Sequence, residues 1–140
     1  MGFIAKIILG MYLLFASLID IRKKRLSIVY LGAGFVIIPL FIISDGVELT
    51  ERLIGLIPGI LLYTISIISK GVGEADIIII ILLGLSIRIG GIILVLMVSF
   101  LIIAVYSGFM LIFGRLKLKS KIPYIPFAFA GYLATCLLQL

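Results

Sequence analysis

Two acidic residues lie where apolar stretches of the chain end or begin, and they are the strongest candidates for chemistry. Asp20 follows the first apolar stretch, and Asp76 directly precedes the run from Ile77 to Leu85. A carboxylate beside hydrocarbon is costly, so function is the default hypothesis for each. Two carboxylates within about 3–6 Å of each other do not easily both ionise, and such a pair shares one proton near neutral pH. That state can activate water for attack on a peptide carbonyl.

Each acid also has a plain structural explanation. Asp76 could be a helix N-cap, and Asp20 could pair at the interface with Arg22 or Lys24. For one acid considered alone, this explanation is at least as good as catalysis. The joint placement of both acids at the ends of apolar helices favours a catalytic pair.

A glycine-hinged turn, Gly71-Val72-Gly73-Glu74-Ala75-Asp76, leads into the fourth apolar stretch. Gly71 and Gly73 allow backbone angles or close approaches that a side chain forbids. Glu74 could complement the positive end of the helix dipole, and it is also the reserve candidate for the second catalytic acid. We expect Glu74 otherwise to contribute to substrate binding.

The composition predicts an all-α integral membrane protein with one domain, residues 1–140. Of the 140 residues 64% are hydrophobic and 13% are charged, and the mean hydropathy is +1.47. These values lie outside the range of soluble proteins. Histidine is absent and Cys136 is the single cysteine, which excludes His/Cys metal sites, Ser-His-Asp triads and an internal disulfide. We expect neither a metal nor a cofactor.

Six apolar stretches qualify, or nearly qualify, as transmembrane helices, since a span needs roughly 20 residues. The fourth is short, and it either continues through the segment Arg88 to Gly91 or does not fully cross. The predicted stretches are Phe3 to Ile19, Ile28 to Ser44, Leu53 to Ser69, Ile77 to Ile87, Gly91 to Phe113, and Pro123 to Leu140.

The charge of the connecting segments predicts the orientation. Nine of the twelve Lys and Arg residues lie in the first, third and fifth connections, whereas the second and fourth carry only Arg52 and Arg88. By the positive-inside bias, the odd connections are cytoplasmic and both termini are outside. Asp20 and Asp76 therefore face the cytoplasm. The basic residues fit a role beside anionic lipid, and no nucleic-acid role is expected.

Three further expectations concern residues other than the candidate acids. Glu48 and Arg52 are expected to form at most an exposed helical pair in an acidic outer connection. Four tyrosines are expected to include interface anchors without a chemical role, namely Tyr12, Tyr30, Tyr124 and Tyr132. Prolines and glycines inside the stretches are expected to bend helices or allow close packing, namely Pro39, Pro58, Gly55 and Gly59.

Three segments give the chain its resemblance to the prepilin peptidase family. The first is Leu18-Ile19-Asp20-Ile21-Arg22, followed by Arg25-Leu26-Ser27-Ile28. The second is the turn from Gly71 to Asp76, which resembles a Gly-x-Gly-Asp type motif. The third is Ile122-Pro123-Tyr124-Ile125-Pro126, a double-proline start to the last helix. Aligned in this way, Asp20 and Asp76 match the family's two catalytic aspartates, and Glu74 remains the reserve.

The resemblance implies a multi-pass protease of the inner (plasma) membrane whose active site faces the cytoplasm. Its implied substrate is a type IV prepilin or pseudopilin precursor, whose short basic leader is removed at the inner face. Because the chain lacks the paired cysteines and extra segment of larger members, we expect a peptidase-only form and leave methyl transfer undecided.

Three other classes of function remain open. A proton- or ion-coupled transport protein also uses membrane carboxylates, but it favours acids near the midplane and an inverted repeat, and neither is visible here. A Ser/Lys peptidase using Ser69 or Ser120 fits poorly, because lysines in loops stay hydrated and protonated. A non-catalytic assembly subunit is the third alternative.

Overall fold

The computed structural model describes residues 2–23, 26–70, 73–115 and 122–138, and within these ranges all regular structure is α-helical. This agrees with the predicted all-α class. Three helical segments are long and apolar enough to cross a membrane, namely 2–23, 49–69 and 89–112. Six crossings, and the side on which the termini lie, remain predictions. The helices are α1 (Gly2–Lys23), α2 (Ile28–Gly34), α3 (Ile37–Asp45), α4 (Leu49–Ile54), α5 (Ile57–Ser69), α6 (Glu74–Ser86), α7 (Ile89–Ile112) and α8 (Ile125–Leu138).

Two of the six predicted stretches are each divided into two helices by a short turn. The turn between α2 and α3 lies just before Pro39, and the turn between α4 and α5 lies just before Pro58. Proline lacks the N–H that would bond four residues back, and its ring crowds that carbonyl. The expected bends at these prolines are therefore present.

Helix α6 lies at the centre of the bundle and packs against α2, α3, α4, α5 and α7. Its central position explains why its sequence is apolar on nearly all sides. The helix begins at Glu74 and ends at Ser86, because Ile87 is extended. Its 13 residues cover about 20 Å, which is less than a hydrocarbon core of about 30 Å. Of the two alternatives for the fourth stretch, the structure has the shorter helix.

Glycines bring the turn between α4 and α5 against α6 at backbone distance. A Cβ added to Gly55 would overlap the carbonyl oxygen of Gly84, and one added to Gly84 would overlap that of Gly55. Further along, a Cβ on Gly59 would come within 2.5 Å of the Ile81 side chain. Close packing by Gly55 and Gly59 was predicted, whereas the contribution of Gly84 was not.

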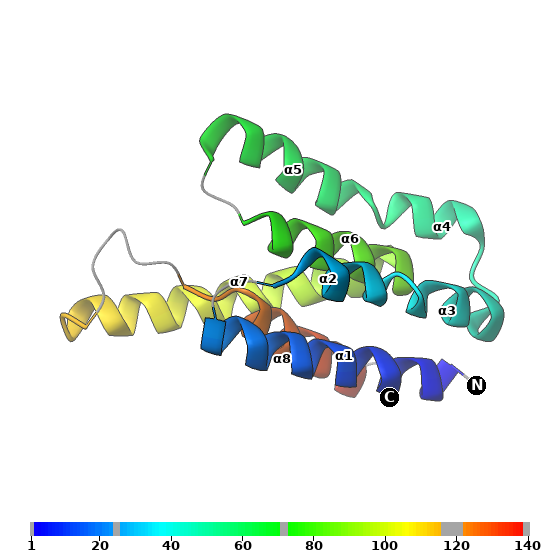
Figure 1. The fold of residues 1–140 in the computed structure, drawn as a ribbon, viewed down its shortest axis with the longest axis horizontal. Helices are drawn as coiled ribbons and strands as arrows, with labels where there is room; N and C mark the ends of the chain where they lie inside the picture. The colour runs from blue at the N-terminus through cyan, green and yellow to red at the C-terminus, as the bar shows by residue number, and fades with distance from the viewer. Residues whose placement is uncertain (1, 24–25, 71–72, 116–121, 139–140) are drawn as a thin grey trace.

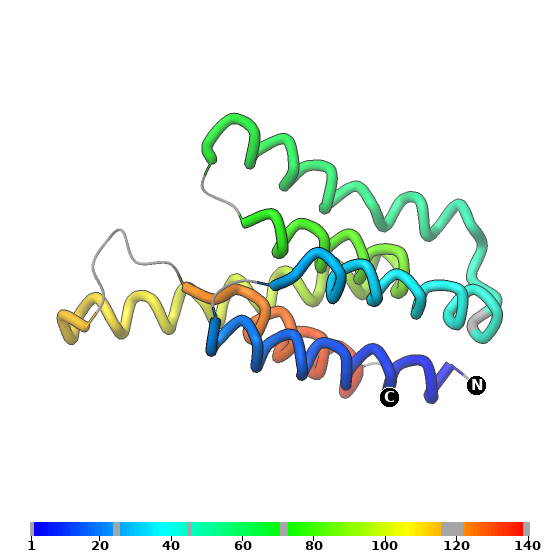
Figure 2. The backbone as a smooth tube through the Cα atoms, in the orientation of Figure 1, coloured from blue at the N-terminus to red at the C-terminus, as the bar shows by residue number. Residues whose placement is uncertain are grey.

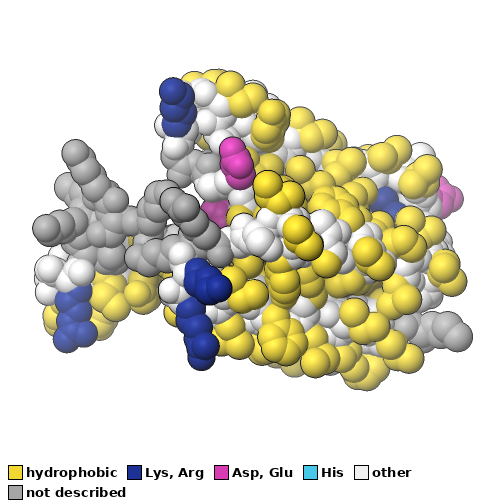
Figure 3. Space-filling view, in the orientation of Figure 1, with side chains coloured by type: hydrophobic (Ala, Val, Ile, Leu, Met, Phe, Trp, Pro, Cys, Tyr) yellow, Lys and Arg dark blue, Asp and Glu magenta, His cyan; other side chains and the backbone are white. Residues whose placement is uncertain are grey.

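The helices run antiparallel, so their ends gather at two opposite ends of the molecule (Figures 1 and 2). The ends of α1, α5 and α7 and the starts of α2, α6 and α8 share one end, which is on the left in Figure 1. Described basic side chains gather at that end, while hydrophobic side chains cover most of the remaining visible face (Figure 3). The described helix ends that flank the first, third and fifth connections therefore share one end of the molecule, and the membrane side of that end stays a prediction.

Arg52 has a different role from the exposed pair with Glu48 that was expected. Its side chain is 2% exposed, and its guanidinium donates to the Leu85 carbonyl at 2.8 Å and the Phe41 carbonyl at 2.9 Å. Arg52 therefore joins α3, α4 and α6. The sequence prediction failed because it counted Arg52 as a solvated loop charge, although the residue lies within α4.

The expectation for the tyrosines also needs correction. Tyr124 and Tyr132 are buried. Tyr12 and Tyr30 stack with ring centroids 5.0 Å apart, and each hydroxyl donates to the other residue's backbone carbonyl. These four side chains join helices to one another, so burial and hydrogen bonding explain them better than anchoring at an interface.

We predict that Arg52→Met destabilises the protein by about 2–4 kcal/mol, because two buried carbonyls lose a charged donor. The measurement is thermal unfolding in detergent, followed by helix content. The control is Arg88→Gln, since Arg88 is 68% exposed on its side chain and pairs with Glu51 at 3.7 Å. That exposed pair should contribute less than about 1 kcal/mol. Equal melting shifts for the two variants would contradict the assignment.

Candidate active site

Asp20 lies in the last turn of α1 and is only 8% exposed. Its carboxylate accepts a hydrogen bond at 3.4 Å from the backbone N–H of Ile125, the first residue of α8. The first N–H groups of a helix have no partner within the helix, so Asp20 supplies an acceptor from a neighbouring helix. The acid is therefore built into the contact between α1 and α8.

Asp76 lies in the first turn of α6, where Gly73 is the N-cap residue. The carboxylate of Asp76 accepts a hydrogen bond from the Gly73 backbone N–H, which is one half of a capping box. The prediction that Asp76 is the N-cap residue is therefore wrong, because Gly73 holds that position and Asp76 is the third residue of the helix. Its side chain nevertheless helps to cap the helix by accepting from Gly73. Capping accounts for its location and does not exclude chemistry.

Gly73 leaves room for the Asp76 carboxylate. Its φ of −69° is accessible to any residue, but an added Cβ would lie 3.0 Å from Oδ2 of Asp76. The predicted close approach is therefore present at Gly73. Gly71, the other predicted motif glycine, lies outside the described residues.

The charge of Asp20 acts on Asp76, although 56 positions separate them in the sequence. Asp76 precedes the apolar part of α6, and its pKa is raised to about 6. Burial is the main cause, repulsion by Asp20 adds to it, and the Gly73 hydrogen bond opposes both. Helices α1 and α6 thus bring the two acids close enough for the charge of Asp20 to raise the pKa of Asp76. The predicted separation of about 3–6 Å stays a prediction.

The remaining candidates are less enclosed. Glu74 is exposed in the first turn of α6, at the same end of the molecule. Arg22, a suggested partner of Asp20, is also exposed, and Lys24 lies outside the described residues. Ser69 is exposed and donates to the Ile65 carbonyl at 2.8 Å. Ser120 lies outside the described residues.

Tyr124 lies near the two acids, and the sequence did not predict this position. It is buried immediately before α8, and its hydroxyl is 3.1 Å from Oγ of Ser99 in α7. The phenol also lies within electrostatic reach of the Asp76 carboxylate. Its position between two prolines at the start of the last helix was the available sequence signal.

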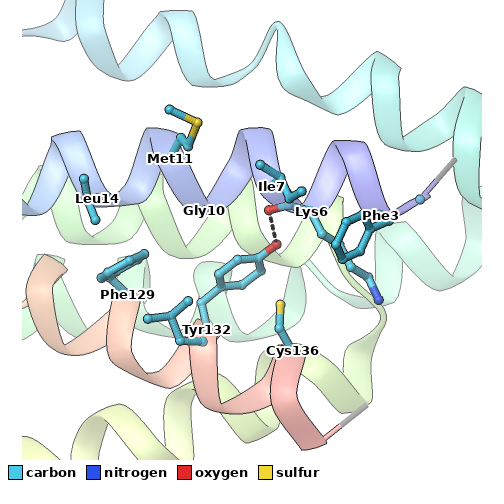
Figure 4. Close-up of a pocket in the computed structure, with 11 residues that line it drawn as sticks. Phe3, Lys6, Ile7, Gly10, Met11, Leu14, Phe129, Tyr132 and Cys136 are labelled. Atoms are coloured by element: carbon cyan, nitrogen blue, oxygen red, sulfur yellow. Dashed lines mark hydrogen bonds between the residues drawn. The ribbon is translucent and has the colours of Figure 1, made fainter. Parts of the chain in front are cut away.

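A separate hollow of about 570 Å³ lies between α1 and α8, toward the end that carries the termini (Figure 4). Its described lining is mainly apolar and includes Phe3, Gly10 and Phe129, but neither candidate aspartate. Tyr132 crosses it and donates to the Lys6 carbonyl at 2.9 Å. The hollow is therefore distinct from the paired acids.

The geometry supports acid–base chemistry by two carboxylates. Within the described residues, no three His, Cys, Asp or Glu side chains gather in a way that could hold a metal ion. Two acids that influence each other's charge can hold one proton between them, so that one carboxylate accepts a proton while the other donates one.

Comparison with known proteins gives one match. Residues 7–108, which include both aspartates, match the sequence model of the type IV leader peptidase family. No curated protein and no solved structure matches the chain.

We predict that Asp20→Asn lowers the pKa of Asp76 from about 6, because a like charge is removed while burial remains. The measurement is the carboxylic C=O infrared band followed against pH, with Asp76→Asn used to assign the band. Glu74→Gln is the control, since solvent screens that exposed side chain. An unchanged titration in Asp20→Asn would show that the two acids are independent.

Proposed function

The chain belongs to the type IV leader peptidase family, and from this premise we propose that it is a membrane aspartic endopeptidase. It removes the short basic leader of a type IV prepilin or pseudopilin precursor at the cytoplasmic face of the inner (plasma) membrane. The observation that carries the proposal is the electrostatic contact between Asp20 of α1 and Asp76 of α6 at one end of the bundle.

The proposed reaction uses the two carboxyl groups and one water molecule. The ionised carboxylate takes a proton from water as the oxygen attacks the scissile carbonyl carbon, while the protonated partner donates to the carbonyl oxygen. The tetrahedral intermediate collapses when the C–N bond breaks and the leaving nitrogen takes a proton from the acid that gained one. At the same time one hydroxyl proton of the intermediate passes to the other carboxylate as the new C=O bond forms, so that the pair again holds one proton. The product carboxylic acid then loses its remaining proton to solvent. No covalent enzyme adduct forms.

The surroundings of the pair suit this reaction. Burial of Asp20 and partial burial of Asp76 reduce competition from bulk water, and hydrogen bonds from Ile125 and Gly73 hold the two carboxylates in place. The leader of the substrate is basic, and the described basic side chains that gather at this end would repel it. Binding of the leader therefore needs an acid. Exposed Glu74 is the acid that we propose to bind the leader.

The position in the membrane follows from charge. The end that holds the acids also carries the basic connections, which the positive-inside bias assigns to the cytoplasm. The precursor's hydrophobic helix would remain in the bilayer while its leader reaches this end. Cleavage at the inner face is therefore the proposed location.

We predict that Asp20→Asn and Asp76→Asn each abolish leader cleavage while the protein remains folded and membrane-inserted, because neither variant keeps two carboxyl groups. The measurement is the size shift of candidate pilin precursors co-expressed with each variant. Glu74→Gln should retain kcat and raise KM, and Glu48→Gln is the control, since Glu48 is exposed in the connection before α4.

Near wild-type cleavage by either aspartate variant would remove the two-acid mechanism. Loss of cleavage in Glu74→Gln with retention in Asp76→Asn would transfer the second role to the reserve acid. No size shift with any precursor would favour the transport alternative.

We also predict that kcat/KM falls as the pH rises through about 6, the pKa of Asp76. The sign follows because the active pair needs one proton, and above this pKa both carboxyl groups are ionised. The measurement is kcat/KM against pH for purified protein, which reports the free enzyme. A rate that is constant from pH 5 to about 8 would contradict a shared proton.

A further inference from the structure

Tyr124 is attached to α8 through its backbone. Its carbonyl oxygen accepts hydrogen bonds from the N–H groups of Phe127 and Ala128, both at 3.0 Å. This makes Tyr124 the N-cap residue of α8. The backbone N–H of the next residue, Ile125, is the group that donates to Asp20.

The side chain of Tyr124 is attached to a different helix, α7. The Ser99 hydroxyl lies 3.0 Å from the Leu96 carbonyl and donates its single proton there. The Tyr124 hydroxyl, 3.1 Å away, must therefore donate to Oγ of Ser99. Both side chains are buried, and the tyrosine ring also contacts Phe100, with centroids 5.9 Å apart.

The two attachments connect α7 to the paired acids. Tyr124 fixes the start of α8 against α7, and the start of α8 holds Asp20 through Ile125. A shift at the start of α8 would therefore lengthen the contact between the Ile125 N–H and the Asp20 carboxylate. A hydrogen bond of this kind favours the ionised form of the acid.

We propose that Tyr124 is a positioning residue for the acid pair: its hydrogen bond to Ser99 fixes the start of α8 so that the Ile125 N–H holds Asp20 in its reactive orientation and charge state. This inference rests on the proposed function. Tyr124 acts through Asp20 and has no direct role in bond breaking.

Tyr124→Phe removes the hydroxyl and keeps the ring. We expect kcat to fall about tenfold, which corresponds to the loss of one ordinary hydrogen bond's contribution at the transition state. We expect KM to change little, because no substrate contact is lost. The acid limb of the pH–rate profile should move to higher pH, since Asp20 keeps its proton longer when the donor is lost.

Tyr132→Phe is the matched control. Tyr132 lies within α8 and is buried like Tyr124, and its hydroxyl also donates to another helix, at the Lys6 carbonyl (Figure 4). It lies near the middle of α8, about two turns away from the Ile125 N–H that donates to Asp20. This variant should keep the wild-type kcat and pH profile. Melting temperatures measured for both variants compare the effects on stability.

Ser99→Ala tests the other half of the contact. It should reproduce the loss of kcat and the shift of the acid limb, and the double variant with Tyr124→Phe should be no worse than either single variant. Additive losses, a wild-type pH profile in Tyr124→Phe, or equal losses in Tyr132→Phe would each overturn the proposal.

Infrared titration of the carboxyl pair gives a readout that needs no substrate. Tyr124→Phe should raise the pH of the first ionisation step, in which Asp20 loses its proton, and Tyr132→Phe should not. An unchanged titration overturns the positioning role even if the wild type cleaves precursors. If the wild type cleaves no precursor but the titration shifts as expected, the protease proposal fails while the positioning of Asp20 stands.

Discussion

Backbone N–H groups at the start of a buried helix need acceptors, and in this protein acidic side chains supply them at the starts of α6 and α8, beside the candidate site. Asp20 accepts from the first residue of α8, and Asp76 accepts from the N-cap of α6. Because unsatisfied backbone groups are costly away from water, these bonds help to determine where the two helices begin. The same hydrogen bonds therefore fix both the packing of these helix starts and the positions of the two acids.

Both ends of α6, the helix at the centre of the bundle, have side-chain partners for their backbone groups. This short helix has its start satisfied by its own Asp76 and a carbonyl of its last turn satisfied by Arg52 of α4. Surrounding helices bury much of its apolar surface. A helix that is too short to cross a bilayer alone is thus stabilised by partners at each end, with Asp76 held in its first turn.

The sequence predicted the features that depend on local composition. Apolar runs located six helical segments, and glycines and prolines marked the bends and the close approach at Gly73. Arg52 and Tyr124 were misjudged, because their roles depend on which distant carbonyl or hydroxyl they meet. A charge count treats every arginine alike, and a single sequence does not reveal which start of a helix lies beside which acid.

The backbone contact between Gly55 and Gly84 has a consequence for sequence variation. Neither residue accepts even a methyl group, since each faces the carbonyl oxygen of the other. Drift at one position cannot be compensated by shrinking its partner, which is already the smallest residue. An alanine at either site would require the turn between α4 and α5 to move away from α6. We therefore expect both positions to remain glycine together in related sequences.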